Sequence, residues 1–210
     1  MIRSLSVCVL LGLGALSAAA SALPDAPSLK PKRVYASQTT DARNAEILHK
    51  AMDAAGRYDW SEVASLQRQA TDPVVRNLIM WVRASEGVPG MGFDEVASAI
   101  DTLPTWPKTD RMRKRAEEII DLSSLSHGDR ILWLTKSGPQ TGAGKIALAR
   151  SYKAVGQPAK AEALVHDAWR NNSMDRDLER IVLATYGGFL TEADHRARIE
   201  FLLWTNQRTA

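Results

Sequence analysis

Histidines and carboxylates are the side chains of this sequence best suited to chemistry, because they transfer protons and bind metal ions. The four histidines are His49, His127, His166 and His195. No two of them are three or four residues apart, the spacing that brings two zinc ligands to one face of a helix. Carboxylates are numerous, but none lies in a context that predicts the raised pKa of a general acid. The sequence therefore predicts no metal site, no cofactor and no catalytic residue.

A glycine-rich run from Gly138 to Lys145 is similar in outline to a phosphate-binding loop. Its first glycine comes one residue too early, and Ile146 stands where such a loop needs Ser or Thr to hold magnesium. No strand is predicted before it. The glycines therefore indicate a loop that precedes a helix.

The charge of the chain gives no sign of a nucleic-acid partner. The formal net charge is only +3, and Arg3 lies in a segment that we expect to be removed. The densest basic run, Arg111 to Arg115, is followed by Glu117 and Glu118, which is typical of a solvated helix face.

Residues 1–22 have the three parts of a secretory signal peptide. A basic start at Arg3 is followed by a short apolar core from Leu5 to Leu16 and by the cleavage site Ala20-Ser21-Ala22. The apolar core is too short to span a membrane. The single cysteine, Cys8, lies in this segment, so no disulfide is expected in the mature chain. An exported chain without disulfides indicates the bacterial periplasm, with no membrane span after cleavage.

The rest of the sequence divides into a lead-in and a helical part. Residues 23–40 carry three prolines and no periodic pattern, so we interpret them as an extended lead-in. Residues 41–210 show apolar residues at helical spacing and no convincing strand. Cap residues and breakers divide this part into about ten helices of an all-α domain, with starts expected near Asp41, Asp72-Pro73, Trp106-Pro107, Thr141, Asp175 and Thr191.

The clearest unit is a helix pair over residues 141–169. Gly156 suits the left-handed conformation that ends a helix, and Pro158 suits the first position of the next. Seven alanines between 147 and 168 allow the two helices to approach closely. Turns recur so that pairs repeat about every 35 residues, within the range of helical repeat proteins. The pattern predicts an α-superhelix, or solenoid, of antiparallel tetratricopeptide-like pairs, each covered by its neighbours.

Two expectations concern burial. The first helix is expected to turn one face inward, formed by Ala45, Leu48, His49, Met52 and Ala55. The six tryptophans are expected to be core wedges between helices, and a row of sugar-stacking rings is the alternative; they are Trp60, Trp81, Trp106, Trp133, Trp169 and Trp204.

Four runs of the sequence carry a family resemblance: GRYDWSEVASLQRQATDPVVRNLIMW, FDEVASAIDTLPTWPKTDRMRKRAEEII, TGAGKIALARSYKAVGQPAKAEALVHDAWRNN and FLTEADHRARIEFLLW. Their most specific features are the Asp-Pro before an apolar helix, the Trp-Pro pair, and Asp194-His195 followed by Leu203-Trp204. The resemblance covers about Ala42 to Trp204. This region resembles the N-terminal superhelical domain of soluble lytic murein transglycosylases in their shorter alphaproteobacterial form.

The resemblance implies a role in peptidoglycan turnover. Members of this family carry a lysozyme-like C-terminal domain that cleaves between N-acetylmuramic acid and N-acetylglucosamine, using one glutamate as acid and then as base. In the family a serine follows that glutamate, and a Gly-Leu-Met-Gln run lies downstream. This sequence has neither motif, so no residue inherits the catalytic role.

The expected function is therefore that of the superhelical, non-catalytic part of such an enzyme, incomplete at its C-terminus. Its expected partners are peptidoglycan glycan strands or a missing C-terminal catalytic domain. A truncated gene product and a stand-alone periplasmic adaptor, tetratricopeptide-like and protein-binding, are the alternatives. A concave face rich in Arg, Asn and aromatics would favour glycan, whereas a groove with apolar pockets would favour a peptide.

Overall fold

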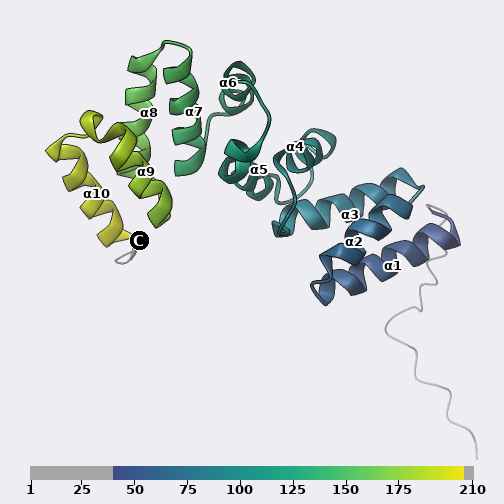
Figure 1. Ribbon diagram of the computed structural model, residues 1–210. Helices are drawn as coiled ribbons and strands as arrows, with labels where there is room; N and C mark the ends of the chain where they lie inside the picture. The colour runs from purple at the N-terminus through teal and green to yellow at the C-terminus, as the bar shows by residue number, and fades with distance from the viewer. Residues whose placement is uncertain (1–39, 206–210) are drawn as a thin grey trace, which may run out of the picture. The chain divides into compact units, whose positions relative to one another are not determined.

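The computed structural model describes residues 40–205, of which 76% are helical and none is in a strand. The all-α prediction with about ten helices is confirmed (Figure 1). The predicted signal peptide, residues 1–22, and all of the lead-in before Thr40 lie outside the described residues. The α-helices are α1 (Ala42–Gly56), α2 (Trp60–Gln69), α3 (Pro73–Glu86), α4 (Phe93–Thr102), α5 (Thr109–Ile119), α6 (His127–Thr135), α7 (Gly142–Ala154), α8 (Pro158–Asn171), α9 (Arg176–Tyr186) and α10 (Glu192–Trp204), with 3₁₀-helices η1 (Ile120–Leu122) and η2 (Gly187–Phe189).

Most helices begin where the sequence places their caps. The side chains of Asp41, Asp72 and Asp175 each accept a hydrogen bond from a backbone N–H in the first helical turn. Gly156 has a positive φ of 76°, and Pro158 is the first residue of α8. These local signals were sufficient because a cap requires only residues near it in sequence.

Helix α5 begins two residues later than the Trp106-Pro107 pair predicts. It starts at Thr109, after Lys108 with a positive φ of 64°. The carbonyl of Pro107 accepts a hydrogen bond from Nε1 of Trp81 at 2.7 Å, and the rings of Trp81 and Trp106 lie 6.1 Å apart. These contacts hold Trp106 and Pro107 in a turn against α3, so they are not available to the first turn of α5.

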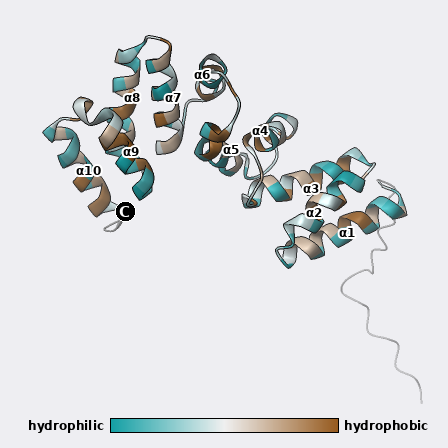
Figure 2. Cartoon of the chain, viewed as in Figure 1, coloured by the Kyte–Doolittle hydropathy of each residue, from teal (hydrophilic) through white to brown (hydrophobic). Residues whose placement is uncertain are grey.

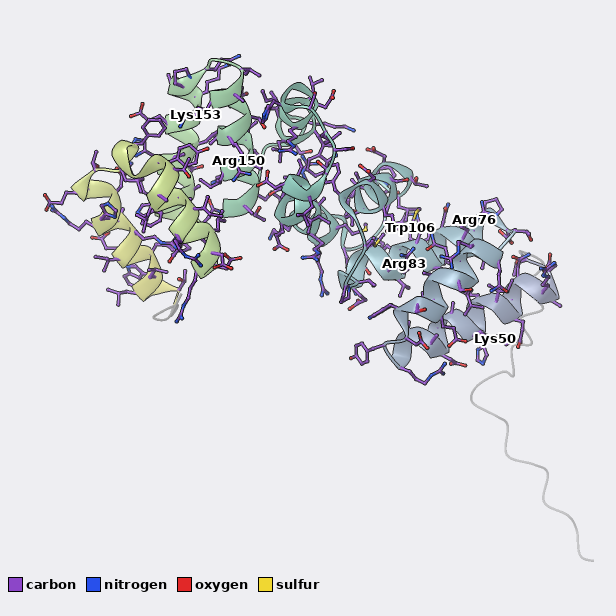
Figure 3. The ribbon with its side chains drawn as sticks, viewed as in Figure 1. Lys50, Arg76, Arg83, Trp106, Arg150 and Lys153 are labelled. Atoms are coloured by element: carbon purple, nitrogen blue, oxygen red, sulfur yellow. The ribbon has the colours of Figure 1, made fainter. Side chains whose placement is uncertain are left out.

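Helices pack chiefly against neighbours that are adjacent or next but one along the chain. Three apolar clusters result, one among α1 to α3, one from α3 to α7, and one among α7 to α9. Arginines add links between neighbours. Arg83 of α3 donates to Gln67 at 2.6 Å and to Glu95 at 3.2 Å, and Arg150 of α7 donates to Asp121 at 2.5 Å (Figure 3).

The buried face of α1 differs from the predicted one. The buried residues are Asn44, Ile47, Ala51 and Ala54, whereas His49 is exposed. Asn44 fixes this rotation through a network with the start of α3. Its amide donates to Oγ1 of Thr71 at 3.0 Å, and its carbonyl oxygen accepts from the N–H groups of Thr71 and Asp72 at 3.0 and 3.1 Å. A polar side chain therefore determines which apolar residues turn inward.

The tryptophans differ in burial. Trp169 is only 5% exposed, as the core prediction requires, whereas Trp204 is 89% exposed and contradicts it. The other four are half-buried.

Candidate functional site

The four histidines contact different groups. His49 pairs with Asp53 on the surface of α1, and Nδ1 of His127 lies 3.4 Å from Oγ of Ser151. Nδ1 of His166 lies 2.9 Å from Oδ1 of Asp194, and the ring of His195 meets Trp169 edge-on at 5.7 Å. Within residues 40–205, no group of three or more His, Cys, Asp or Glu side chains is placed to hold a metal ion.

The glycine-rich loop before α7 is occupied by a carboxylate of the chain itself. The N–H groups of Gln140 and Thr141 donate to Glu117 Oε2 at 2.9 and 2.8 Å, and Oγ1 of Thr141 donates to the same oxygen at 2.8 Å. Glu117 is fully buried, and Lys145 pairs with Asp167 at 2.6 Å. The carboxylate takes the N–H groups that a phosphate would need, so this loop serves to begin α7.

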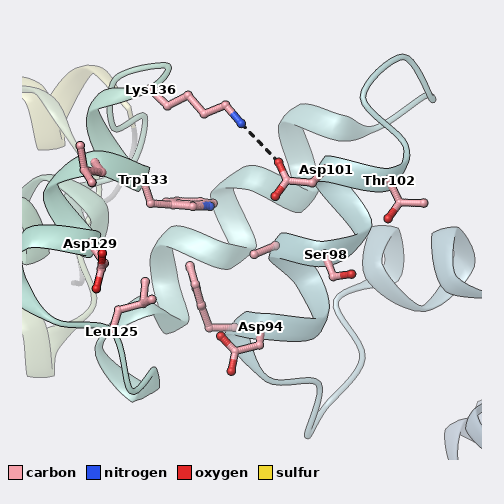
Figure 4. A pocket seen from close by; sticks show the side chains of 11 residues that line it. Asp94, Ser98, Asp101, Thr102, Leu125, Asp129, Trp133 and Lys136 are labelled. Atoms are coloured by element: carbon pink, nitrogen blue, oxygen red, sulfur yellow. Dashed lines mark hydrogen bonds and ion pairs between the residues drawn. The ribbon is translucent and has the colours of Figure 1, made fainter.

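A groove of about 620 Å³ lies between α4 and α6 (Figure 4). Helix α4 contributes Asp94, Ala97, Ser98 and Asp101, and α6 with the residue just beyond it contributes Asp129, Leu132, Trp133 and Lys136. In each set the residues are spaced i, i+3, i+4 and i+7, which places them on one face of a helix. Two helix faces of mixed apolar and polar character therefore face each other across the groove.

Local capping interactions fix the starts of both helices. Glu95 accepts a hydrogen bond from the N–H of Gly92 at 3.4 Å at the start of α4. Oγ of Ser126 accepts from the N–H of Asp129 at 3.1 Å and donates to its carboxylate at 2.7 Å at the start of α6. The orientation of Asp129 at the groove thus follows from the cap of its own helix.

Trp133 reaches from α6 into the space between α6 and α4 (Figure 4). The guanidinium of Arg113 lies 4.7 Å from its ring centroid, and Phe93 packs edge-on at 5.1 Å. Arg113 also donates to the carbonyl of Trp133 at 3.3 Å. The indole is therefore held in one orientation while remaining half-exposed.

A second hollow, of about 340 Å³, adjoins the groove. Asp101, Trp133 and Lys136 line both spaces, and Nζ of Lys136 lies 3.3 Å from Oδ1 of Asp101 (Figure 4). This ion pair joins the two helices, since Lys136 follows α6 and Asp101 belongs to α4. Trp133 and the ion pair thus stand between two adjoining open spaces.

The polar groups of the groove are mainly acceptors. Three carboxylates, those of Asp94, Asp101 and Asp129, lie against a single ammonium, that of Lys136. Within residues 40–205, the carboxylate of Asp94 has no hydrogen-bond or ion-pair partner. Carboxylate acceptors beside an oriented indole, one of them unpaired, suit a ligand that combines hydroxyl or amine donors with an apolar face.

Sequence reasoning assigned Trp133 to the core and did not single out the three aspartates. The usable signal was the repeated i, i+3, i+4, i+7 spacing, which puts Asp94 with Asp101 on one helix face and Trp133 with Asp129 on another. That the two faces meet depends on how α4 and α6 pack, and spacing does not give it.

Comparison of the chain with family models, with curated proteins and with solved structures finds no match. The likeness to lytic transglycosylases therefore depends on the sequence motifs alone. Within residues 40–205, no helix combines the length and the apolar character that crossing a membrane requires.

Proposed function

We propose that this chain is a non-catalytic helical module of peptidoglycan turnover that binds glycan strands in the periplasm through the groove at Trp133. In this proposal its helices form part of an α-superhelix of the lytic transglycosylase type. Cleavage belongs to a separate catalytic domain, and residues 1–22 direct export. The observation that carries the proposal is the half-exposed indole of Trp133 among the carboxylates of Asp94, Asp101 and Asp129.

The groove has the aromatic ring expected of a glycan site but no Arg or Asn, so its match to a glycan strand depends on the indole and the carboxylate acceptors. A pyranose ring has an apolar C–H face that packs on an indole, and its hydroxyl and amide N–H groups donate hydrogen bonds around the rim. Hydrogen bonds to carboxylates are stronger than those between neutral groups. Because Arg113 and Phe93 already orient Trp133, little ordering of the indole is left for binding.

The packing of the helices supports the superhelical part of the proposal. Contacts between neighbours that are adjacent or next but one, with three successive apolar clusters, are the pattern expected when each repeat contacts only its neighbours. An open array of this kind offers a long surface to a polymer.

A peptide-binding adaptor is the second candidate, and the apolar part of the same groove favours it. Phe93, Leu125 and Leu132 line the groove beside Trp133. Grooves between helices with such side chains accept the apolar face of an amphipathic helix. With an acidic rim, the preferred peptide would be basic.

Calorimetric titration of the whole chain distinguishes the two functions. The ligands are peptide-free glycan strands prepared from peptidoglycan and, separately, a basic amphipathic peptide. Trp133→Ala should weaken glycan binding at least about tenfold. This corresponds to a loss of roughly 1.4 kcal/mol or more of binding free energy, because one stacked ring is removed. Trp204→Ala, which removes the exposed indole of α10, is the matched control and should leave glycan affinity unchanged. Circular dichroism of each variant shows that it is folded.

Three outcomes decide between the candidates. Glycan binding lost in Trp133→Ala alone supports the proposed function. If the chain binds the peptide but does not bind the glycan, the result supports the peptide-binding adaptor instead. Equal glycan affinity in Trp133→Ala and Trp204→Ala would show that the groove is not the glycan-binding site. The proposal that the chain is non-catalytic has a separate test. Release of anhydromuropeptides from sacculi by the purified chain would contradict it.

A further inference from the structure

Helix α10 does not separate its polar and apolar residues into an outer and an inner face. Its two buried residues are Asp194 and Arg198, at 0% and 4% exposure. Its exposed residues include Ile199 at 58%, Leu203 at 60% and Trp204 at 89%. Figure 2 shows the hydrophobic colour on the C-terminal half of this helix. A helix of a soluble domain ordinarily turns its apolar stripe inward, so α10 presents to solvent the kind of surface that helices bury.

Both inward polar residues make several interactions with neighbouring elements, which hold α10 in this rotation. Asp194 accepts from the N–H of Thr191 at 2.7 Å and from Nε of Arg170 at 2.5 Å. Arg198 donates to the carbonyl of Asn172 at 2.5 Å and to the carboxylate of Glu179. Turning Ile199 and Leu203 inward would break these interactions inside the protein, which is strongly unfavourable. Among the described residues, the apolar side chains of Ile199 and Leu203 therefore stay exposed.

The charges beside the stripe are self-complementary. Arg196 and Glu200 flank Ile199 on the outer side of the helix, and both are exposed. Among residues 40–205, Arg196 pairs only with Glu192 of its own helix, in a contact where both side chains are largely exposed. Glu200 has no partner within residues 40–205. An antiparallel copy of α10, related by a twofold axis near Ile199, brings Arg196 of each copy near Glu200 of the other.

We propose that two copies of this chain associate through the outer faces of α10. The stripe of Ile199 and Leu203 forms the apolar centre, and reciprocal Arg196–Glu200 pairs flank it. This isologous arrangement uses the same patch on both subunits. One helix from each copy covers less than the usual interface of about 800 Å² per partner. We therefore expect a weak association, and the test below is designed for a dissociation constant on the order of 10 µM.

Sedimentation velocity of the whole chain, at concentrations from about 1 to about 200 µM around that constant, tests the proposal. The mass should rise from one chain to two across this range. Leu203→Lys should remain monomeric throughout. Leu122→Lys, which changes a leucine that is 86% exposed outside α10, is the matched control and should dimerise like the unchanged chain.

Charge reversal sharpens the test. Arg196→Glu alone and Glu200→Arg alone each place like charges opposite one another and should weaken dimerisation at least about tenfold. The double variant restores opposite charges and should recover most of it. A monomer at every concentration, a dimer that Leu203→Lys leaves intact, or a double variant no better than the singles would each overturn the proposal. Circular dichroism of every variant separates loss of association from loss of folding, and none of the outcomes depends on glycan binding.

Discussion

Helices α7 and α10 are alike in outline and differ in how the protein holds them. Each has 13 residues, and each starts after a threonine, Thr141 or Thr191, whose hydroxyl accepts from the third N–H of the helix. Each threonine also donates its N–H and hydroxyl to a buried carboxylate, that of Glu117 or Asp194. The two helices differ in the side chains that they bury beyond these shared caps.

Helix α7 is packed through small and apolar side chains. Its buried residues are Gly142, Gly144, Ile146, Ala147, Leu148, Ala149 and Ser151. It lies against α5 and α6 as well as α8, so it is covered on more than one side. Such packing is sensitive to side-chain volume, because a close-packed interior has little room for added atoms.

Helix α10 is packed through ionic side chains and supplies no member of the three apolar clusters. Burial acts to raise the pKa of the Asp194 carboxyl, but hydrogen bonds from Thr191, His166 and Arg170 outweigh it and hold the pKa well below its usual range. An interface of this kind depends on each partner being present, because removing one leaves the other buried and unpaired. We therefore expect substitutions in α7 and in α10 to destabilise the protein for different physical reasons.

The largest expected effect is at Arg198. Replacing it with Met keeps the aliphatic bulk but leaves the carbonyls of Trp169 and Asn172 and the carboxylate of Glu179 without their donor. We expect a loss of about 3–5 kcal/mol in the free energy of unfolding, the usual cost of breaking a buried ion pair. Urea denaturation followed by circular dichroism measures it.

Arg180→Met is the matched control for that substitution. Arg180 pairs with Asp177 on the surface of α9, where both side chains are at least 75% exposed. Its loss should change stability by less than about 0.5 kcal/mol. Equal effects of the two arginine substitutions would mean that α10 is not held by its buried ions.

The same contrast explains what the sequence could predict. Caps and the Gly156–Pro158 turn were predictable because their partners are a few residues away. In α7 the apolar residues Ile146 and Ala149 are buried, so the apolar pattern and the core agree there. In α10 an apolar pattern would bury Ile199 and Leu203, yet the structure exposes both.

The signal that was missing for α10 is long-range. The partners of Asp194 in α8 are 24 and 28 residues away, and Arg198 reaches Trp169 across 29 residues. No local pattern identifies such pairs. The groove at Trp133 shows the same limit, since the spacing within each helix is readable but the meeting of α4 and α6 is a result of packing.

A smaller effect is expected where α7 approaches α5 most closely. A Cβ at Gly144 would lie 2.6 Å from Oε2 of the buried Glu117, which already accepts three hydrogen bonds from the loop before α7. Gly144→Ala should therefore destabilise the protein by about 1–3 kcal/mol, the range for overpacking. Thermal and urea denaturation measure the change.

Gly128→Ala provides the control within a helix. A Cβ there meets only Oγ of Ser126 at 3.7 Å, an ordinary contact. The gain in helix propensity should then stabilise the protein by up to about 1 kcal/mol. If Gly144→Ala were stabilising as well, close approach at Glu117 would not be what positions α7.

The smallest expected effect is the pH dependence contributed by Asp194. Its pKa is lowered in the folded protein, so its stabilisation is complete above the unfolded pKa of about 3.9 and is lost as the pH falls below that value. Between about pH 5 and pH 3 the loss should be about 1 kcal/mol if the folded carboxyl stays ionised. Other carboxyls with lowered pKa values, such as Asp167, contribute to the same trend in the whole protein. The difference between the unchanged chain and Asp194→Asn isolates the share of Asp194, measured as urea denaturation at both pH values. The variant should lose about 1 kcal/mol less over this interval, and identical losses would show that α10 does not depend on an ionised Asp194.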